Sequence, residues 1–180
     1  MANRIVITGG PGSAKTEFLE RLKSDHDFSE FTFFDELARK LLESEPRYRT
    51  DFHALHLAIY EQQVARENAI GDAPFITDRG TVDAFAFHPE TMVLVNTNLE
   101  REYRRYTAVI QLGSAANLGE DVYCTDDIRQ ESVEEALQIE RAIRKVWEHH
   151  PGYAYIPADP NLENKFNLFR CKIIAFLSTT

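Results

Sequence analysis

Cysteine is scarce in this 180-residue sequence, which contains only Cys124 and Cys171. Two cysteines so far apart form no metal-binding motif, and we expect both to be reduced thiols. Long apolar runs are also absent, because no segment reaches the roughly 18 consecutive apolar residues of a membrane-spanning helix. The beginning of the sequence lacks the layout of a signal peptide. We therefore expect a cytoplasmic protein without a membrane span.

Basic residues are also few, with 20 Lys and Arg against 29 Asp and Glu, and the formal net charge is −9. General binding of nucleic acid needs a basic surface, so we do not expect a nucleic-acid partner. Hydrophobic residues make up 43% of the chain, which excludes a disordered composition. The length suits a single domain with its own core, and we expect one domain over residues 1–180.

Short apolar runs alternate along the chain with segments of helical period. The runs that predict strands are residues 5–7, 31–34, 75–77, 107–112 and 154–156. Helical spacing predicts helices over 51–70, 132–147 and 160–177, the second behind a Ser132/Glu135 capping box and the third beginning at Asp159-Pro160. This alternation predicts an α/β fold with a parallel sheet covered on both faces. The polar stretch at about 113–130 has no clear period and predicts a lid.

The strongest local motif follows the first predicted strand and opens a helix, the context that a Walker A phosphate loop requires. Its residues are Gly9, Gly10, Pro11, Gly12, Ser13, Ala14, Lys15 and Thr16. Glycines let successive backbone N–H groups turn toward phosphate oxygens, and the helix N-terminus adds partial positive charge. We expect Gly10 to Thr16 to bind nucleotide, with the Lys15 ammonium on the β- and γ-phosphates and the Thr16 hydroxyl on Mg²⁺.

One residue departs from the motif, since Ala14 stands where a second glycine is expected. Alanine costs little there if the backbone is already helical, but it narrows the space beside the phosphates. A dinucleotide-binding fingerprint is the alternative interpretation of Gly10 and Gly12. We reject it because the third glycine is missing and Lys15 is present.

Charged residues follow two further predicted strands. Asp78 and Arg79 come after residues 75–77, where Asp78 could ligate Mg²⁺ or accept a proton and Arg79 could neutralise phosphate. A simple Asp–Arg turn is the alternative. Glu36 and Arg39 follow residues 31–34, and the carboxyl ends of parallel strands face one crevice. They predict substrate contact, or else a surface ion pair of under about 1 kcal/mol.

Taken in order, these pieces resemble the P-loop kinase-like family built around the ribosylnicotinamide kinase domain of NadR. The matching segments are residues 5–16, Glu36 to Arg39, Gln63 to Glu67, Asp78 to Asp83, 106–112 and 129–157. The resemblance implies a three-layer P-loop NTPase fold whose five-stranded parallel sheet has the order 2-3-1-4-5. It also implies that Gln63 and Glu67, on the helix over 51–70, line the pocket of the phosphoryl acceptor. A solvated helix face is the other interpretation of these two residues.

The sequence therefore predicts a kinase that transfers the γ-phosphoryl group of ATP to a small hydroxyl-bearing acceptor, such as a nucleoside. Catalytic candidates are Lys15, Asp78 and the lid residue Arg129, which could stabilise transition-state charge. Residues 164–167, Asn-Lys-Phe-Asn, lack the final Asp of the guanine-binding motif and lie inside a predicted helix. We read them as coincidence and expect ATP, with GTP as the alternative. A non-catalytic nucleotide-dependent switch and a kinase of nucleic-acid ends are the other candidate functions.

Overall fold

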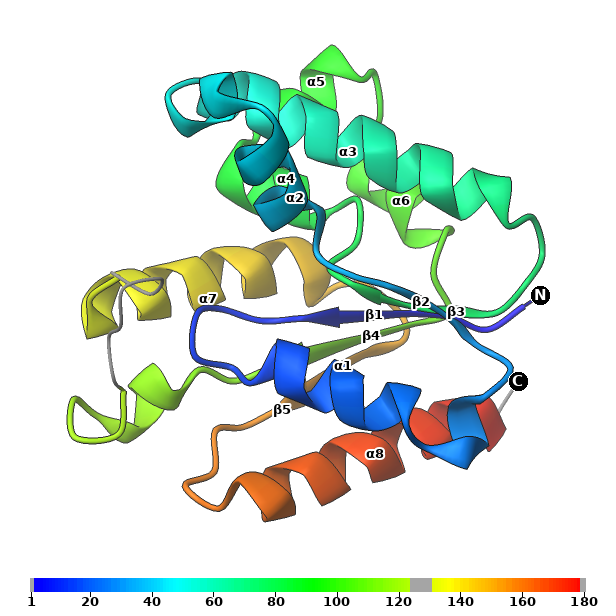
Figure 1. Cartoon of the computed structure of the whole chain (residues 1–180), viewed down its shortest axis with the longest axis vertical. Coiled ribbons are helices and arrows are strands. Elements are labelled where there is room, and N and C mark those ends of the chain that lie inside the picture. The colour runs from blue at the N-terminus through cyan, green and yellow to red at the C-terminus, as the bar shows by residue number, and fades with distance from the viewer. Residues whose placement is uncertain (1, 124–130, 179–180) are drawn as a thin grey trace.

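The computed structural model describes residues 2–123 and 131–178 of the chain. Its centre is a five-stranded parallel sheet of order β2-β3-β1-β4-β5 (Figure 1). The strands are β1 (Arg4–Thr8), β2 (Thr32–Phe34), β3 (Phe75–Asp78), β4 (Ala108–Leu112) and β5 (Tyr153–Ile156). All five predicted strands and their predicted order are confirmed.

Helices cover both faces of the sheet, so the molecule has three layers with the sheet in the middle (Figure 1). One face carries α1 (Lys15–Lys23) and α8 (Leu162–Ser178). The other carries α2 (Leu37–Ser44), α3 (Phe52–Ala69), α4 (Asp83–Phe87), α5 (Glu90–Leu94), α6 (Leu99–Tyr103) and α7 (Val133–Trp147). Short 3₁₀ turns lie at η1 (His26–Phe28), η2 (Pro46–Arg49) and η3 (Ala115–Leu118).

The central strand divides its side chains between two apolar cores. Ile5 and Ile7 of β1 are fully buried against a cluster that contains Phe18 of α1. Val6 points to the other face, where it belongs to a cluster with Trp147 of α7. Alternation along a strand produces this division, and a strand buried on both faces is typically a nearly continuous apolar run. The run Ile-Val-Ile therefore fixes β1 at the centre of the molecule.

The last helix begins after Pro160 rather than at it, which corrects the predicted start. The side chain of Asn161 accepts hydrogen bonds from the backbone N–H groups of Glu163 (3.0 Å) and Asn164 (3.1 Å), so Asn161 caps α8. Asp159 instead accepts from the N–H of Asn161 at 2.7 Å and stabilises the preceding turn. The capping box at Ser132 and Glu135 is confirmed at the start of α7.

Among the described helices, none combines the length and the apolarity that crossing a membrane would require. Cys171 is an exposed free thiol on α8, and Cys124 lies outside the described residues.

Strand register brings the candidate site together at one edge of the sheet. Ile7 of β1 pairs with Asp78 of β3, and Thr8 pairs with Gln111 of β4. The chain then leaves β1 for the glycine-rich loop at the carboxyl ends of the same strands. The loop between β1 and α1 and the end of β3 are thus immediate neighbours.

Candidate phosphate-binding site

The loop between β1 and α1 alternates in backbone conformation. Gly12 has φ +71° and Ala14 has φ +68°, both left-handed, and Lys15 then begins the right-handed helix α1. Successive N–H groups in such alternating backbone form a concave nest that binds anions. The nest opens at the N-terminus of α1, where the helix dipole also favours negative charge. The geometry therefore fits phosphate, as the motif predicts.

Lys15 lies folded over this loop. Its Nζ donates to the carbonyl oxygen of Gly9 (2.8 Å), to that of Gly10 (3.3 Å) and to Oγ of Ser13 (3.2 Å). Burial lowers the pKa of Lys15, and the neighbouring Arg79 lowers it further. A desolvated ammonium that is held by neutral carbonyls has a strong preference for an anionic partner. Hydrogen bonds to charged phosphate oxygens would be stronger than its present bonds to neutral carbonyl oxygens.

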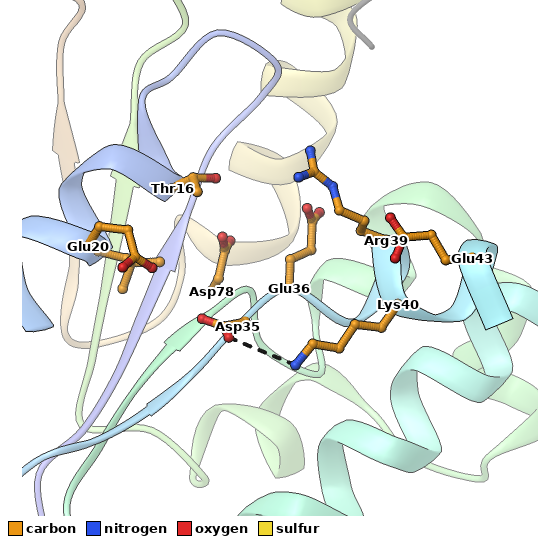
Figure 2. A pocket seen from close by; sticks show the side chains of 9 residues that line it. Thr16, Glu20, Asp35, Glu36, Arg39, Lys40, Glu43 and Asp78 are labelled. Carbon is orange, nitrogen blue, oxygen red and sulfur yellow. Dashed lines mark ion pairs between the residues drawn. The ribbon is translucent and has the colours of Figure 1, made fainter.

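Asp78 is the buried carboxylate of the site. Its side chain is 4% exposed, and its Oδ1 has no hydrogen-bond partner within the described part of the chain. Burial raises the pKa of Asp78 to about 6, an effect that Lys15 opposes and Glu36 increases. Figure 2 shows Asp78 beside Thr16 and Glu36 at the edge of one cavity. A buried carboxylate that lines a cavity and has an unpartnered oxygen is suited to accept a proton or to bind a cation.

Arg79 holds the next position in a strained backbone, with φ +67°. Its guanidinium bridges two acidic side chains, Glu36 at 3.0 Å and Asp83 at 3.3 Å. Burial alone would raise the pKa of Glu36, but Arg79 and then Lys15 outweigh it and hold that pKa below its usual value. Glu36 therefore pairs with Arg79, and not with Arg39, the partner in the ion-pair alternative.

Asp83, for which the sequence suggested no role, stabilises this turn through hydrogen bonds. Its carboxylate accepts from the N–H of Gly80 (2.8 Å), from Nε1 of Trp147 (3.2 Å) and from the hydroxyl of Thr8. A buried carboxylate needs several such donors to offset its lost hydration. Asp83 thereby connects β1, α7 and the turn that carries Arg79.

Two adjoining cavities form the crevice at this sheet edge. One, of about 460 Å³, runs along the loop residues Pro11 to Glu17 and reaches Arg79 and Glu131. The other, of about 300 Å³, contains Asp78 and lies between α1 and α2 (Figure 2). Thr16, Glu36 and Arg39 line both cavities. The structure therefore brings the loop residues Pro11 to Thr16 together with Asp78, Arg79, Glu36 and Arg39 around these two cavities, whereas Gly10 lines neither.

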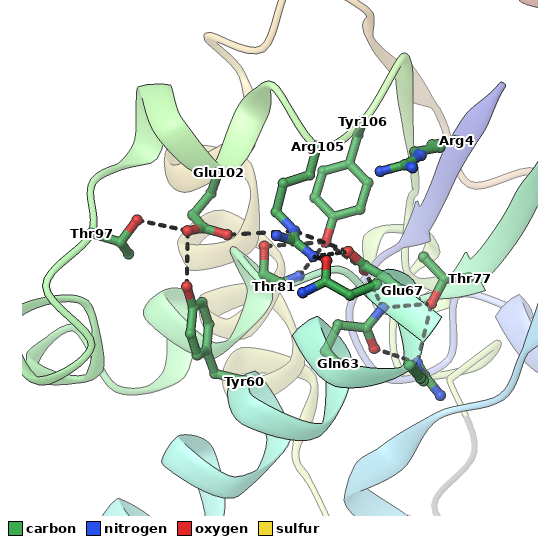
Figure 3. A network of polar contacts seen from close by, with 12 residues as sticks. Arg4, Tyr60, Gln63, Glu67, Thr77, Thr81, Thr97, Glu102, Arg105 and Tyr106 are labelled. Carbon is green, nitrogen blue, oxygen red and sulfur yellow. Dashed lines mark hydrogen bonds and ion pairs between the residues drawn. The ribbon is translucent and has the colours of Figure 1, made fainter. Parts of the chain in front are cut away.

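Gln63 and Glu67 are not part of that space. They are 2% and 0% exposed and belong to a polar network between α3 and the sheet (Figure 3). Glu67 forms an ion pair with Arg105 at 2.8 Å and accepts from the hydroxyl of Tyr106 at 2.8 Å. The burial of these side chains shows that the solvated alternative is wrong, and their contact with the acceptor stays a prediction. Gln63 donates to Glu67 and to Thr77 of β3 at 3.1 Å.

This network nevertheless acts on the site through the backbone. The hydroxyl of Thr77 donates to the carbonyl of Arg79 at 2.8 Å, and the hydroxyl of Tyr106 accepts from the N–H of Thr81 at 2.8 Å. Both bonds hold the strained turn that carries Arg79. Glu67, which the family resemblance places at the acceptor pocket, thus stabilises the end of β3.

The described part of the predicted lid, residues 113–123, packs against the phosphate loop. Tyr123 is buried with Ala116 of η3 and Ala136 of α7, and its ring lies over Gly12. A Cβ on Gly12 would come within 2.8 Å of that ring. The rest of the predicted lid, including Arg129, lies outside the described residues, so the role of Arg129 stays a prediction.

Magnesium is the metal that the phosphate loop implies, and the residues fit it. Thr16 and Asp78 present a hydroxyl and a carboxylate to the same cavity, and Mg²⁺ prefers such oxygen ligands together with nucleotide phosphates and water. Within the described residues there is no group of three or more His, Cys, Asp or Glu that could hold a metal alone. A site completed by phosphate oxygens needs no such group.

Comparison with known proteins agrees with this architecture. The AAA domain family matches residues 4–165. Among solved structures, deoxyadenosine kinase from M. mycoides with bound dATP is similar, with a TM-score of 0.63 and 12% sequence identity. The alignment covers 94% of this chain and 98% of that one, and at this identity it shows a shared fold. None of the curated proteins matches the chain.

The conformation of Ala14 leads to a stability prediction. Left-handed backbone costs an L-residue about 1–2 kcal/mol relative to glycine, so a glycine at this position stabilises the folded state by that amount. The greater conformational freedom of glycine in the unfolded chain offsets about 0.4–1 kcal/mol of this stabilisation. We expect Ala14→Gly to raise the free energy of unfolding by about 0.5 kcal/mol, measured by urea denaturation. A loss of more than 1 kcal/mol would show that the loop does not hold residue 14 in this conformation.

The buried carboxyl of Asp78 leads to a prediction on pH. Its folded-state pKa of about 6 lies above the ordinary value of 3.8, so the folded chain binds this proton more tightly than the unfolded chain. Its contribution to stability is present below pH 4 and is lost as the pH rises to about 6.

Without nucleotide, Asp78→Asn should therefore be more stable than the wild type at pH 7.5, by up to about 3 kcal/mol. The two proteins should converge near pH 4. Thermal melting across pH 4–8 measures the difference, with the exposed Asp72→Asn as the matched control. A difference that is independent of pH would contradict the assignment.

Proposed function

The chain belongs to the AAA domain family, and we propose that it is an Mg²⁺-dependent ATP-binding kinase with a small hydroxyl-bearing acceptor. The observation that carries the proposal is a buried, unpartnered carboxylate oxygen of Asp78 in the same crevice as the phosphate loop. A protein that only binds nucleotide would use this carboxylate solely to hold Mg²⁺. A kinase could also use it as the proton acceptor, because the acceptor hydroxyl loses its proton during transfer.

The phosphate-side cavity would hold the nucleotide. The amides of the loop would hold the β-phosphate, and Lys15, which now donates to the carbonyls of Gly9 and Gly10, would pair with the β- and γ-oxygens. Arg79, held by Glu36 and Asp83, places a second fixed cation at the cavity wall. Such preorganised charge stabilises a phosphoryl group without rearrangement during the reaction.

Mg²⁺, when bound, would neutralise charge on the phosphate oxygens, and Thr16 and Asp78 are the residues placed to hold it. Asp78 could instead take the acceptor proton directly. Its pKa of about 6 keeps it ionised at neutral pH yet basic enough to accept a proton. The two roles are the ones predicted from sequence, and both use the carboxylate of Asp78.

The acceptor would occupy the cavity between α1 and α2. Glu36 and Arg39 line it and offer an acceptor and a donor group to hydroxyls of the substrate. Likeness to the fold of a deoxyadenosine kinase, and the sequence resemblance to ribosylnicotinamide kinase domains, support a nucleoside or a related metabolite. Arg129 keeps its sequence-based role as a source of transition-state charge, and cytoplasmic location and preference for ATP over GTP belong to the same proposal.

Acceptor-stimulated release of ADP tests the proposal. The wild type should release ADP from Mg·ATP faster when members of a nucleoside panel are added. Asp78→Asn should lower that stimulated rate by about 10²-fold or more while ATP affinity changes only a few-fold, since loss of a general base costs on the order of 10²–10⁴. Lys15→Ala should lose ATP affinity itself.

Exposed residues supply the controls for this experiment. Asp72→Asn and Lys145→Ala make the same chemical changes away from the crevice and should behave as wild type. Tight ATP binding without stimulation by any acceptor would favour the nucleotide-dependent switch. Wild-type turnover in Asp78→Asn would contradict the kinase mechanism.

A further inference from the structure

A buried lysine of α8 contacts the phosphate loop from behind. Lys165 is 4% exposed, and its Nζ donates to the carbonyl oxygens of Ser13 (2.9 Å) and Gly113 (2.7 Å). Within the described residues, no carboxylate lies within ion-pairing distance of this ammonium. Burial lowers its pKa to about 8, with Glu140 acting in the opposite direction and Lys15 in the same one. Burial of a charge without a counter-charge is costly, so the bonds that it makes require an explanation.

The partner carbonyl belongs to a series of three. The carbonyl of Pro11 accepts from the hydroxyl of Ser114, that of Gly12 from the N–H of Ala115 at 3.0 Å, and that of Ser13 from Lys165. Three consecutive peptide groups of the loop therefore direct their oxygens toward the end of β4 and α8. The segment after β4 is itself fixed, because Glu140 of α7 accepts from the N–H of Ser114.

The direction of these oxygens sets the direction of the amides. In a trans peptide the C=O of one residue and the N–H of the next point to opposite sides of the chain. With the carbonyls of residues 11–13 facing β4 and α8, the N–H groups of Gly12, Ser13 and Ala14 face the opposite side. They are the amides that a phosphate would meet. The left-handed φ of Ala14 is held in this arrangement by the bond from Lys165 to the preceding carbonyl.

We propose that Lys165 is a positioning residue for phosphate binding, and that its ammonium fixes the orientation of the loop peptides by joining the Ser13 carbonyl to the end of β4. The inference rests on the proposed nucleotide binding. It assigns a role to Lys165 in the sequence Asn-Lys-Phe-Asn, whose likeness to a guanine-binding motif is a coincidence. Lys165 contacts the loop and lines neither cavity of the crevice. Its effect should therefore appear on any ligand that the loop binds through phosphates and on no other ligand.

Equilibrium binding by calorimetry tests this role with three probes: Mg·ATP, Mg·tripolyphosphate and adenosine. Lys165→Met keeps the length of the side chain and removes its donors. We expect the Kd values for ATP and tripolyphosphate to rise together by about tenfold or more, with adenosine binding unchanged within twofold. Lys165→Arg, which keeps the donors and charge, should recover part of the loss. Lys172→Met, an exposed position on the same helix, controls for the change of net charge.

The outcomes separate this inference from the proposed function. If the wild type fails to bind ATP, the proposed function is wrong. If the wild type binds ATP and Lys165→Met binds it equally well, the positioning role is wrong and the function stands. Equal weakening of ATP and adenosine would show a general structural loss and would also overturn the role. Should Lys165→Met fail to fold, Lys165→Gln, which keeps one donor group, must show an intermediate, phosphate-selective loss.

Discussion

In our proposal, the orientation of a few peptide groups between β1 and α1 determines what this molecule can bind. Their carbonyls are bound by the segment after β4 and by α8, and their amides consequently face the crevice. An anion site built this way needs little added charge, because backbone dipoles and one helix terminus supply the positive potential. It does need a rigid surround, and the fully buried central strand β1 provides it.

A second constraint acts at the end of β3, where acidic and basic groups are buried together. Asp83 holds the turn from β1 and α7, and the network around Glu67 holds it from α3 and β4 (Figure 3). These contacts keep Arg79 in a left-handed conformation that is energetically unfavourable for a residue other than glycine. The same packing leaves Asp78 buried with one oxygen unpartnered. The raised pKa of this carboxyl therefore depends on the packing of the residues around it.

Much of this could be predicted from the sequence, because the determining signals are local. The Ile-Val-Ile run and the glycine-lysine loop after it define β1, and the resemblance supplied the strand order. Asp78 and Arg79 were found because parallel strands end at one edge. Ala14 was harder, since nothing local distinguishes a left-handed alanine from one that begins a helix.

Non-local pairing explains what could not be predicted from the sequence. Glu67 has the appearance of a surface residue on a helix, yet its partners Arg105 and Tyr106 come from a distant segment that packs over it. Lys165 precedes the buried Phe166 of α8, but no spacing rule indicates that its acceptors are the carbonyls of Ser13 and Gly113. Buried polar groups are defined by partners that only the folded chain brings near.

The central claim is that the loop recognises phosphate groups, and the most direct test is the affinity of the wild type for AMP, ADP and ATP with Mg²⁺. Each added phosphate should gain charge-assisted hydrogen bonds from the loop and Lys15, so ATP should bind roughly 100-fold or more tightly than AMP. Equal affinity for AMP and ATP would contradict the account, because it would mean that the loop between β1 and α1 does not hold the β- and γ-phosphates.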